Sequence, residues 1–426
     1  MPVDLSPAGR PSGYPPRMRF WPWAAKWFVC NVFGSVCVLL AWPKGEPARG
    51  LEFWSWIVGA PNGVFLVLLG LARAGYEILW YRSYWRNHHR DRWLAEKIRL
   101  AQRPLHVVGA GYCLPLAGKS LVGVLADKQS LLKMQSPRHG SGKVSCSRFE
   151  DRDPLLAGLP VAGEDDSEGD DAGVLVKVAP AVQMIRVALE PLVGNIQALT
   201  RYEKPYWPQV RVLAVPETAD LYVAHVREAL RLAALPPLDV QAVPATDGLL
   251  VADSWLDARE SRPLLAVAAA WYDDAIDEGC AEGSVAVLLD PGYFRLPPEV
   301  RRKAVLHRPV QAINGEAEYG FANAAIWGKA KAAAVTRAWI TRPVEHSGRA
   351  LAAAGFQAAS KDAAQHRLDR IVGNMGAANS LLAIAAAIEA GATVGPQLVV
   401  DGLQSAILHV IPAEQTNAST HDDSPK

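Results

Sequence analysis

The segment LHVVGAGYCLPLAGKSL, residues 105–121, joins an apolar run to glycines and to Gly118-Lys119-Ser120. A phosphate-binding loop needs the pattern G-x-x-x-x-G-K-[ST], in which successive backbone N–H groups surround one phosphate. Here Cys113 stands where the first glycine should be, the nearest glycine is Gly111, and Pro115 removes an N–H donor. We therefore expect a strand followed by a glycine-rich turn, with nucleotide binding as an alternative hypothesis.

The cysteines do not form a recognisable site. No pair has the spacing of metal ligands, and there is no dense framework of the kind found in disulfide-rich secreted proteins. This usage is typical of a reducing compartment. The five cysteines are Cys30, Cys37, Cys113, Cys146 and Cys280.

The histidines are also dispersed. Asp253-Ser254 with His225 or His307 could be assembled into a hydrolase site, but the G-x-S-x-G elbow of such enzymes is absent. His307 lies between an apolar run and Arg308, which favours a structural loop histidine. The isolated histidines are His346, His366 and His409.

Acidic groups suggest two further candidates, and neither is convincing. Asp290 follows the apolar run SVAVLL and is the candidate metal-binding aspartate of the nucleotide hypothesis. Asp273-Asp274 with Asp277-Glu278 is typical of a solvated loop. The sequence therefore assigns no catalytic, cofactor-binding or metal-binding residue.

Two apolar runs near the N-terminus have the length and composition of membrane spans. Trp27–Trp42 extends back to Phe20 and gives about the 20 residues that cross a bilayer, and a second run covers residues 53–72. Tryptophans cluster at the ends of both runs, as in an aromatic belt. A cleaved signal peptide is the alternative, but no convincing cleavage site follows the first run. We predict two transmembrane helices over residues 20–72.

The distribution of lysine and arginine predicts the orientation of this hairpin. Four basic residues precede the first run and eight follow the second, whereas the connector, residues 43–50, contains only Lys44 and Arg49. The positive-inside rule then places both termini in the cytoplasm and predicts a bacterial inner-membrane protein. Over the whole chain, 44 basic and 43 acidic residues nearly cancel, so net charge gives no indication of nucleic-acid binding.

Residues 73–103 follow the second run and read as a basic, aromatic helix. Aromatic residues recur every four positions with arginines between them, a pattern that suits a helix at an anionic membrane surface. Nucleic-acid binding is the alternative. His88-His89 is interpreted as part of the polar face of this helix.

Residues 104–412 predict a layered α/β domain in the cytoplasm. Continuous apolar runs such as 210–216, 263–271 and 283–290 are typical of strands covered on both faces. An acidic, glycine-rich insert at about 135–173 and the tail 413–426 are expected to be disordered, as are residues 1–19.

The C-terminal part of this domain has two more specific features. Residues 376–390 are almost entirely small or aliphatic, which predicts a core helix. Residues 397–412 predict a hairpin turning at Asp401-Gly402.

The stretch Gly373-Asn374-Met375-Gly376-Ala377-Ala378-Asn379 resembles the Gly-His-x-x-Gly-Ala-Ala-Gly motif of the β-ketoacyl synthases in the thiolase superfamily. Two other segments, 278–290 and 251–257, are similar to neighbouring parts of that family. The resemblance covers residues 105–412 and implies a thiolase-like fold, with homodimerisation left open. It also implies a cysteine nucleophile and two histidines. No cysteine lies between Cys146 and Cys280, and Asn374 replaces the motif histidine.

The sequence therefore predicts a non-enzymatic membrane protein whose thiolase-like domain serves as a scaffold or adaptor. A further resemblance, to membrane proteins of bacterial type VI secretion clusters, implies secretion-apparatus subunits or an effector as protein partners beside the lipid bilayer. The alternative is a membrane-associated acyl-transfer or condensing enzyme that uses Cys113 or Cys280 in a rearranged site. No cofactor is predicted.

Overall fold

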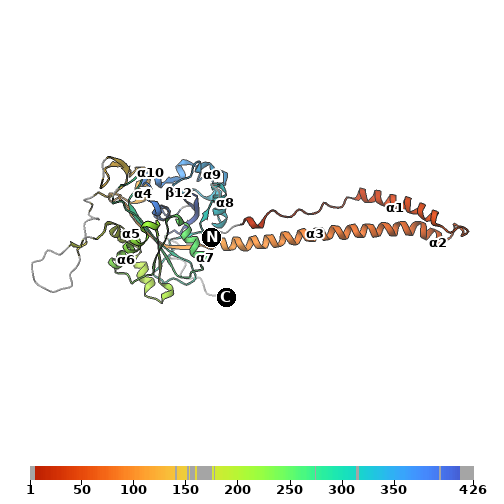
Figure 1. Ribbon diagram of the computed structural model, residues 1–426, viewed down its shortest axis with the longest axis horizontal. Helices are drawn as coiled ribbons and strands as arrows, with labels where there is room; N and C mark the ends of the chain where they lie inside the picture. The colour runs from red at the N-terminus through yellow and green to blue at the C-terminus, as the bar shows by residue number, and fades with distance from the viewer. Residues whose placement is uncertain are drawn as a thin grey trace, which may run out of the picture. The chain divides into compact units, whose positions relative to one another are not determined.

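A computed structural model describes residues 5–139, 142–150, 153, 159–160, 175–176, 178–273, 275–312, 316–392 and 395–412 (Figure 1). The chain divides into two compact units, one formed by Asp4–Lys97 and one that begins at Ile98. The acidic stretch 163–173 and the tail 413–426, both predicted to be disordered, lie outside the described residues.

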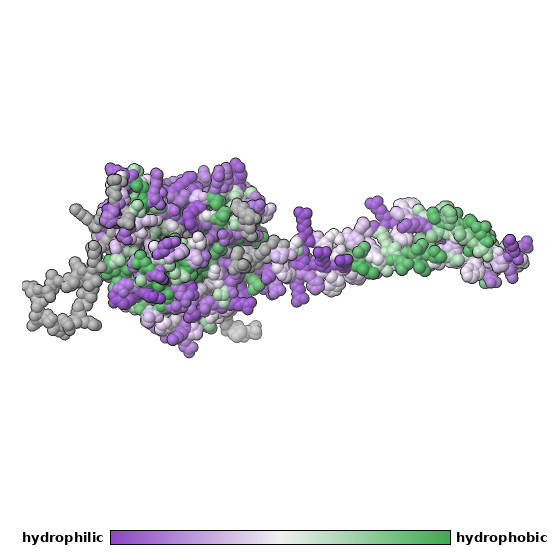
Figure 2. Space-filling view, in the orientation of Figure 1, coloured by the Kyte–Doolittle hydropathy of each residue, from purple (hydrophilic) through white to green (hydrophobic). Residues whose placement is uncertain are grey.

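The first unit contains two helices long and apolar enough to cross a membrane. The first is α1 (Phe20–Ala41). The second runs through α2 (Leu51–Trp54), the π-helix η2 (Ser55–Gly59) and α3 (Ala60–Ala101). Figure 2 shows hydrophobic residues gathered over the part of these helices nearest the connector, while the arginine-rich part of α3 is hydrophilic.

The basic stretch predicted to be helical, residues 73–103, is helical to Ala101, and it continues the second apolar run within α3. No proline occurs between Asn62 and Gln102, so nothing in the sequence interrupts the helix. Pro104 then disfavours helical geometry at the residue before it, which ends α3.

Polar side chains connect α1 to the second helix. The Trp27 indole Nε1 donates to Asn62 Oδ1 at 2.8 Å, and Asn62 Nδ2 donates to Asn31 Oδ1 at 3.0 Å. Ser35 Oγ donates to the carbonyl oxygen of Ile57 in the π-helix at 3.2 Å. These bonds satisfy polar groups that would otherwise face hydrocarbon if the helices span a bilayer.

The two helices also approach closely at one glycine. A Cβ atom at Gly34 would lie 2.7 Å from the ring of Pro61, so only glycine fits without a shift of the backbone.

The N-terminal segment is not disordered throughout, contrary to the sequence prediction. Ser12 exchanges two hydrogen bonds with the side-chain amide of Asn87 on α3, at 2.7 and 3.0 Å. Arg90 Nε donates to the Gly9 carbonyl at 3.0 Å, and the Tyr14 ring lies 5.7 Å from that of Trp80. Long polar side chains of α3 thus bond to the backbone of this segment, and an aromatic side chain of α3 packs against Tyr14.

The second unit is built on one mixed sheet in the order β13-β12-β14-β15-β10-β1-β9-β8-β6-β7, with β11 (Val310–Gln311) pairing to β15. The first half-sheet comprises β1 (Leu105–Cys113), β6 (Gln209–Ala214), β7 (Val240–Pro244), β8 (Leu264–Ala270) and β9 (Gly283–Asp290). The second comprises β10 (Ala304–Leu306), β12 (Arg337–Thr341), β13 (Gln365–Arg367), β14 (Gln397–Asp401) and β15 (Gln404–Val410).

The two half-sheets repeat one topology. If the strands of each half are numbered along the chain, both have the spatial order 3-2-4-5-1, and strand 5 is antiparallel to both of its neighbours. The halves meet where β1 pairs with β10, in the register Leu105↔Leu306. The predicted hairpin at Asp401-Gly402 is confirmed as β14–β15.

Helices cover the sheet in layers, which confirms the predicted layered α/β class. α5 (Pro180–Thr200) and α6 (Ala219–Leu232) pack on the first half-sheet, and α8 (Ala317–Trp327) and α9 (Ser347–Ala353) pack on the second. α11 (Asn379–Glu389) touches strands of both halves and is buried from Asn379 to Ala387, as predicted for a core helix. With it lie α4 (Leu121–Asp127), α7 (Leu250–Asp257) and α10 (Leu368–Ile371).

Short elements complete the unit. Within the insert predicted to be disordered, β3 (Val144–Cys146) pairs with β2 (Lys133–Gln135), so this part of the prediction was wrong. β4 (Leu159–Pro160) pairs with β5 (Leu175–Val176). The unit's 3-10 helices are η4 (Lys204–Tyr206), η5 (Pro216–Thr218), η6 (Ala245–Asp247), η7 (Ala332–Ala334), η8 (Asp362–Ala364) and η9 (Gly376–Ala378), whereas η1 (Ser6–Ala8) belongs to the first unit.

A buried arginine joins the two halves. Arg308 follows β10 in the second half, and its guanidinium pairs with Asp253 and Asp257, one turn apart on α7 of the first half. Arg308 is 4% exposed and Asp253 2%. Removing one partner of such a pair leaves an uncompensated buried charge.

We therefore expect Arg308→Met to lower the free energy of unfolding by about 3 to 5 kcal/mol, because Asp253 would stay buried without its partner. Denaturant unfolding of the detergent-solubilised full chain measures this loss. The control is Arg295→Met, at an exposed position, which should change stability by less than about 0.5 kcal/mol. The double variant with Asp253→Leu should recover part of the loss. Equal stability of the two single variants would contradict this role.

Candidate functional site

The motif that resembles the synthases forms a turn between α10 and α11 that is closed on itself. Asn374 Oδ1 accepts hydrogen bonds from Gly376 N at 3.0 Å and from Asn379 Nδ2 at 2.6 Å, and Met375 N donates to Asn379 Oδ1 at 3.0 Å. Gly373 has φ +104°, a conformation that favours glycine. The carbonyl of the Asn374 side chain is therefore occupied in holding the turn.

The backbone of this turn pairs with the segment before β9. Asn374 N donates to Gly279 O at 2.8 Å, and Ala281 N donates to Asn374 O at 2.9 Å. On its other side the same segment pairs with β3, because Gly279 N donates to Ser145 O at 2.8 Å. Three backbone segments thus form a small hydrogen-bonded ladder: the end of β3, the segment around Cys280 and the turn at Asn374.

Cys280 lies in the middle strand of this ladder and is half-buried. Burial raises the pKa of its thiol, and a hydrogen bond from Tyr272 only partly opposes that effect. Burial likewise raises the pKa of Cys146 on β3, and it raises the pKa of Cys113, at the end of β1, to about 12. Since the thiolate is the nucleophilic form of cysteine, these thiols are not activated at neutral pH.

A buried ion pair attaches the β2–β3 hairpin to the segment that contains Cys280. Arg138, between these strands, pairs through both terminal nitrogens with Glu282, which is 0% exposed. Arg138 also donates to Tyr272 O at 2.8 Å, and its guanidinium carbon lies 3.7 Å from the centroid of the Trp271 ring. Glu282 accepts a further bond from Phe149 N at 3.1 Å. These contacts fix the position of the β2–β3 hairpin relative to the ladder.

A side chain from the second half of the sheet packs against the N-terminal end of α7. Gln404 on β15 accepts from Leu249 N at 2.7 Å and donates to Thr246 O at 2.9 Å. A Cβ atom at Gly248 would lie 2.6 Å from Gln404 Oε1. One side chain thus occupies the space at the N-terminal end of α7.

The contacts of Lys119 and Ser120 do not support the phosphate-loop hypothesis. Lys119 Nζ pairs with Asp127 Oδ2 and with Gln129 Oε1, each at 3.2 Å, and Ser120 Oγ accepts from Gly123 N as the cap of α4. Asp290 is buried and pairs with Arg302 at 3.3 Å.

A cavity of about 410 Å³ adjoins this loop. Its charged lining mixes bases with acids, namely Lys119, Lys133, Arg148, Glu150 and Asp153. A site built for phosphate would favour bases alone.

Among the histidine candidates only His307 and His409 are in contact with each other within the described part of the chain, and the others pack against different side chains. Asp253 pairs with the buried guanidinium of Arg308, which gives this carboxylate a structural role. His225 packs edge-on against Tyr222, and His366 stacks on Trp339 with ring centroids 4.3 Å apart. The exposed His346 lies 3.5 Å from Glu345. His409 is a neighbour of His307, at 5.0 Å between ring centroids.

The acidic candidates do not converge either. Asp273 accepts a bond from Trp271 Nε1 at 2.6 Å, and Asp274 lies outside the described residues. No group of three or more metal-binding side chains occurs among the residues that the structure describes.

Comparison with known proteins returns structural similarity alone. No family model and no curated protein matches the chain. Similar solved structures include ChlB3, described as an acyltransferase (13% identity, TM-score 0.43, covering 72% of this chain and 98% of that one), and 3-oxoacyl-[acyl-carrier-protein] synthase III from Aquifex aeolicus (13%, 0.40, 72% and 99%). Another is the oxazolomycin ketosynthase domain OzmH KS7 of Streptomyces albus (12%, 0.45, 72% and 74%). Because these TM-scores are below 0.5, the layered class rests on this chain's own strand pairing.

His307 gives a pH-dependent prediction. Burial, reinforced by His409 and Lys329, lowers its pKa from 6.5 to about 4, and burial with Arg302 does the same for His106. The unfolded chain then binds protons that the folded chain does not, so stability falls as pH drops from 6.5 to about 4.

We expect His307→Gln to flatten this fall by about 2 to 3 kcal/mol, leaving the part due to His106. Denaturant unfolding of the full chain at a series of pH values measures the slope. His346→Gln changes an exposed imidazole and serves as the control. An unchanged slope in His307→Gln would show that His307 is not the group responsible.

Proposed function

We propose that this chain is a non-enzymatic protein of the bacterial inner membrane, in which two N-terminal helices anchor a thiolase-like α/β body that serves as a scaffold or adaptor for other proteins. The observation that carries the proposal is the hydrogen-bonded ladder around Cys280 and Asn374, in which both residues have structural roles. In the synthases that the sequence resembles, this motif would supply a histidine. Here its asparagine holds a turn.

Three features of the body support a scaffold over an enzyme. The thiols of Cys113, Cys146 and Cys280 have raised pKa values, which disfavours the nucleophilic form. Gln404 of the second half bonds to Leu249 and Thr246 of the first, and the Arg138–Glu282 pair is buried beside the segment that contains Cys280. The fold itself is large, duplicated and held by its own core, and a fold can persist when its chemistry is lost.

The first unit supports the membrane anchor. α1 is 22 residues long, its 18-residue apolar window is 0% buried, and the second helix has a comparable window. Uncovered apolar side chains of this length and number favour a bilayer as their surroundings. The asymmetry of lysine and arginine supports a cytoplasmic location for both termini.

Membrane attachment is tested by fractionation. We expect the full-length protein to sediment with membranes, to resist extraction at alkaline pH, and to enter solution only with detergent, because its apolar helices would be exposed to water otherwise. A peripheral protein of the same cells, released by the alkaline wash, is the control. Recovery of the chain in the soluble fraction without detergent would refute the anchor.

The loss of acyl chemistry is tested with a thiol-reactive acyl probe and acyl thioester substrates. We expect no turnover and no rapid labelling of Cys113, Cys146 or Cys280 at neutral pH, because these buried thiols are protonated; the labelled cysteines are identified by peptide mapping, since Cys37 is exposed. The variants Cys280→Ala and Cys113→Ala should then match the parent. Turnover that disappears in either variant would establish the acyl-transfer alternative in place of the scaffold.

The partner is approached by affinity capture of the detergent-solubilised full chain followed by mass spectrometry. The resemblance to membrane proteins of type VI secretion clusters makes secretion-apparatus subunits and effectors the expected partners. Enrichment of acyl carrier proteins instead would favour the enzyme alternative.

A further inference from the structure

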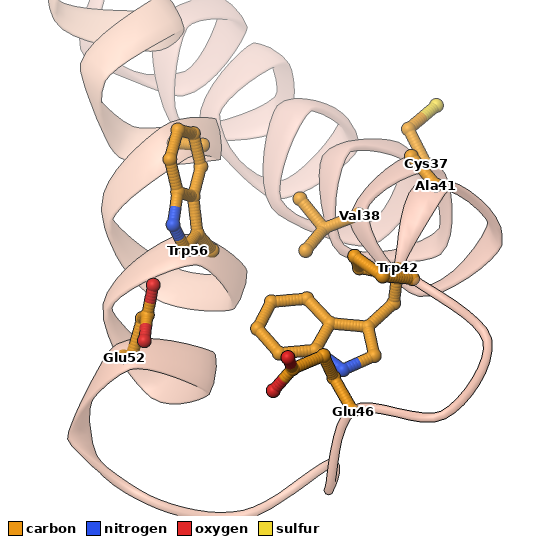
Figure 3. Close-up of a pocket in the computed structure, with 9 residues that line it drawn as sticks. Cys37, Val38, Ala41, Trp42, Glu46, Glu52 and Trp56 are labelled. Atoms are coloured by element: carbon orange, nitrogen blue, oxygen red, sulfur yellow. The ribbon is translucent and has the colours of Figure 1, made fainter.

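A second site lies at the turn of the helical hairpin, away from the motif of the α/β body. A cavity of about 620 Å³ opens between the end of α1, the connector and the start of the second helix. Figure 3 shows Trp56 and Glu52 on one side of it, and Trp42 with Glu46 on the other. The lining is completed by Cys37, Val38, Ala41, Pro43 and Ala60.

The chemistry of this lining selects a cation. Two indole rings and two carboxylates converge on the cavity, whereas the connector bases Lys44 and Arg49 do not line it. Aromatic faces attract ammonium groups, and tryptophan does so most strongly. Carboxylates add Coulomb attraction and would repel an anionic ligand. The cavity is therefore suited to an ammonium group.

An apolar groove adjoins the same cavity. It has a volume of about 390 Å³ and runs between α1 and α3, where it is lined by aliphatic side chains, Phe33, Gly34 and Pro61. Cys37, Val38 and Ala60 line both spaces, so the groove and the cavity share a wall. A ligand that fills both carries an ammonium group at one end and a hydrocarbon chain at the other.

The position along the hairpin identifies which amphiphile is available. Trp42 directly follows α1 and Trp56 lies within the first two turns of the second helix, so in a bilayer both indoles would lie near the level of the lipid headgroups. In addition, the indole N–H of Trp42 is buried without a hydrogen-bond partner among the described residues. A lipid ester or phosphate oxygen would satisfy that donor.

We propose that this site binds a zwitterionic phospholipid with an ammonium headgroup, the headgroup between Trp42 and Trp56 and one acyl chain in the groove between α1 and α3. The proposal rests on the membrane anchor proposed above. It adds a specific lipid ligand held by Glu46 and Glu52.

The test uses the full-length protein, delipidated in detergent, with phosphatidylethanolamine or phosphatidylglycerol of identical acyl chains added back. Native mass spectrometry measures the fraction of protein that retains lipid. We expect the ethanolamine lipid to be retained about three- to tenfold better, because only its headgroup carries the ammonium. Trp56→Leu and Glu52→Gln should each reduce that preference by a similar factor.

The matched controls are Trp54→Leu, two residues from Trp56 but outside the lining, and Glu77→Gln on α3. Both should keep the preference. Equal retention of the two lipids, or equal loss in Trp54→Leu and Trp56→Leu, would overturn the lipid site. Fractionation separates the two proposals, since a chain that stays in the membrane yet shows no lipid preference retains its anchor and lacks the site.

Discussion

The pairing of Arg308 with two aspartates of α7 is the interaction on which the body depends. The two half-sheets are joined directly by only a short register between β1 and β10. Arg308 adds a charged contact from the second half to a helix of the first, inside the protein, where its charge requires compensation. Gln404 adds a second contact between the same helix region and the second half, through Leu249 N and Thr246 O.

The core and the turn at Asn374 both have structural roles in the body. The core around α11 is formed mainly by aliphatic and alanine side chains that pack against both half-sheets. Asn374 meets a structural need, because its carbonyl accepts two hydrogen bonds inside the turn. The residues of the motif therefore contribute to folding whether or not the chain turns over a substrate.

Local pattern predicted most elements of the fold. Continuous apolar runs gave β6, β8 and β9, the small-residue segment gave α11, and Asp401-Gly402 gave the β14–β15 turn.

The contacts that close the candidate site could not be predicted. Arg138 and Glu282 are 144 positions apart, and Gln404 lies 155 positions from Leu249. Nothing in their neighbouring residues indicates a partner at such distances. Arg138 also lies in a stretch whose glycine and charge content suggested disorder, and its order comes from the tertiary contact itself.

The π-helix at Ser55–Gly59 sets the angular phase between two parts of the hairpin. Successive residues of an α-helix are rotated by about 100°, and a π-turn holds one residue more than an α-turn. With that residue present, Glu52 and Trp56 face the end of α1 while Asn62 faces Trp27 and Asn31. Deleting a single residue here would turn either Glu52 and Trp56 or Asn62 away from α1 by about a quarter of a revolution. The number of residues in this stretch is therefore constrained as well as their types.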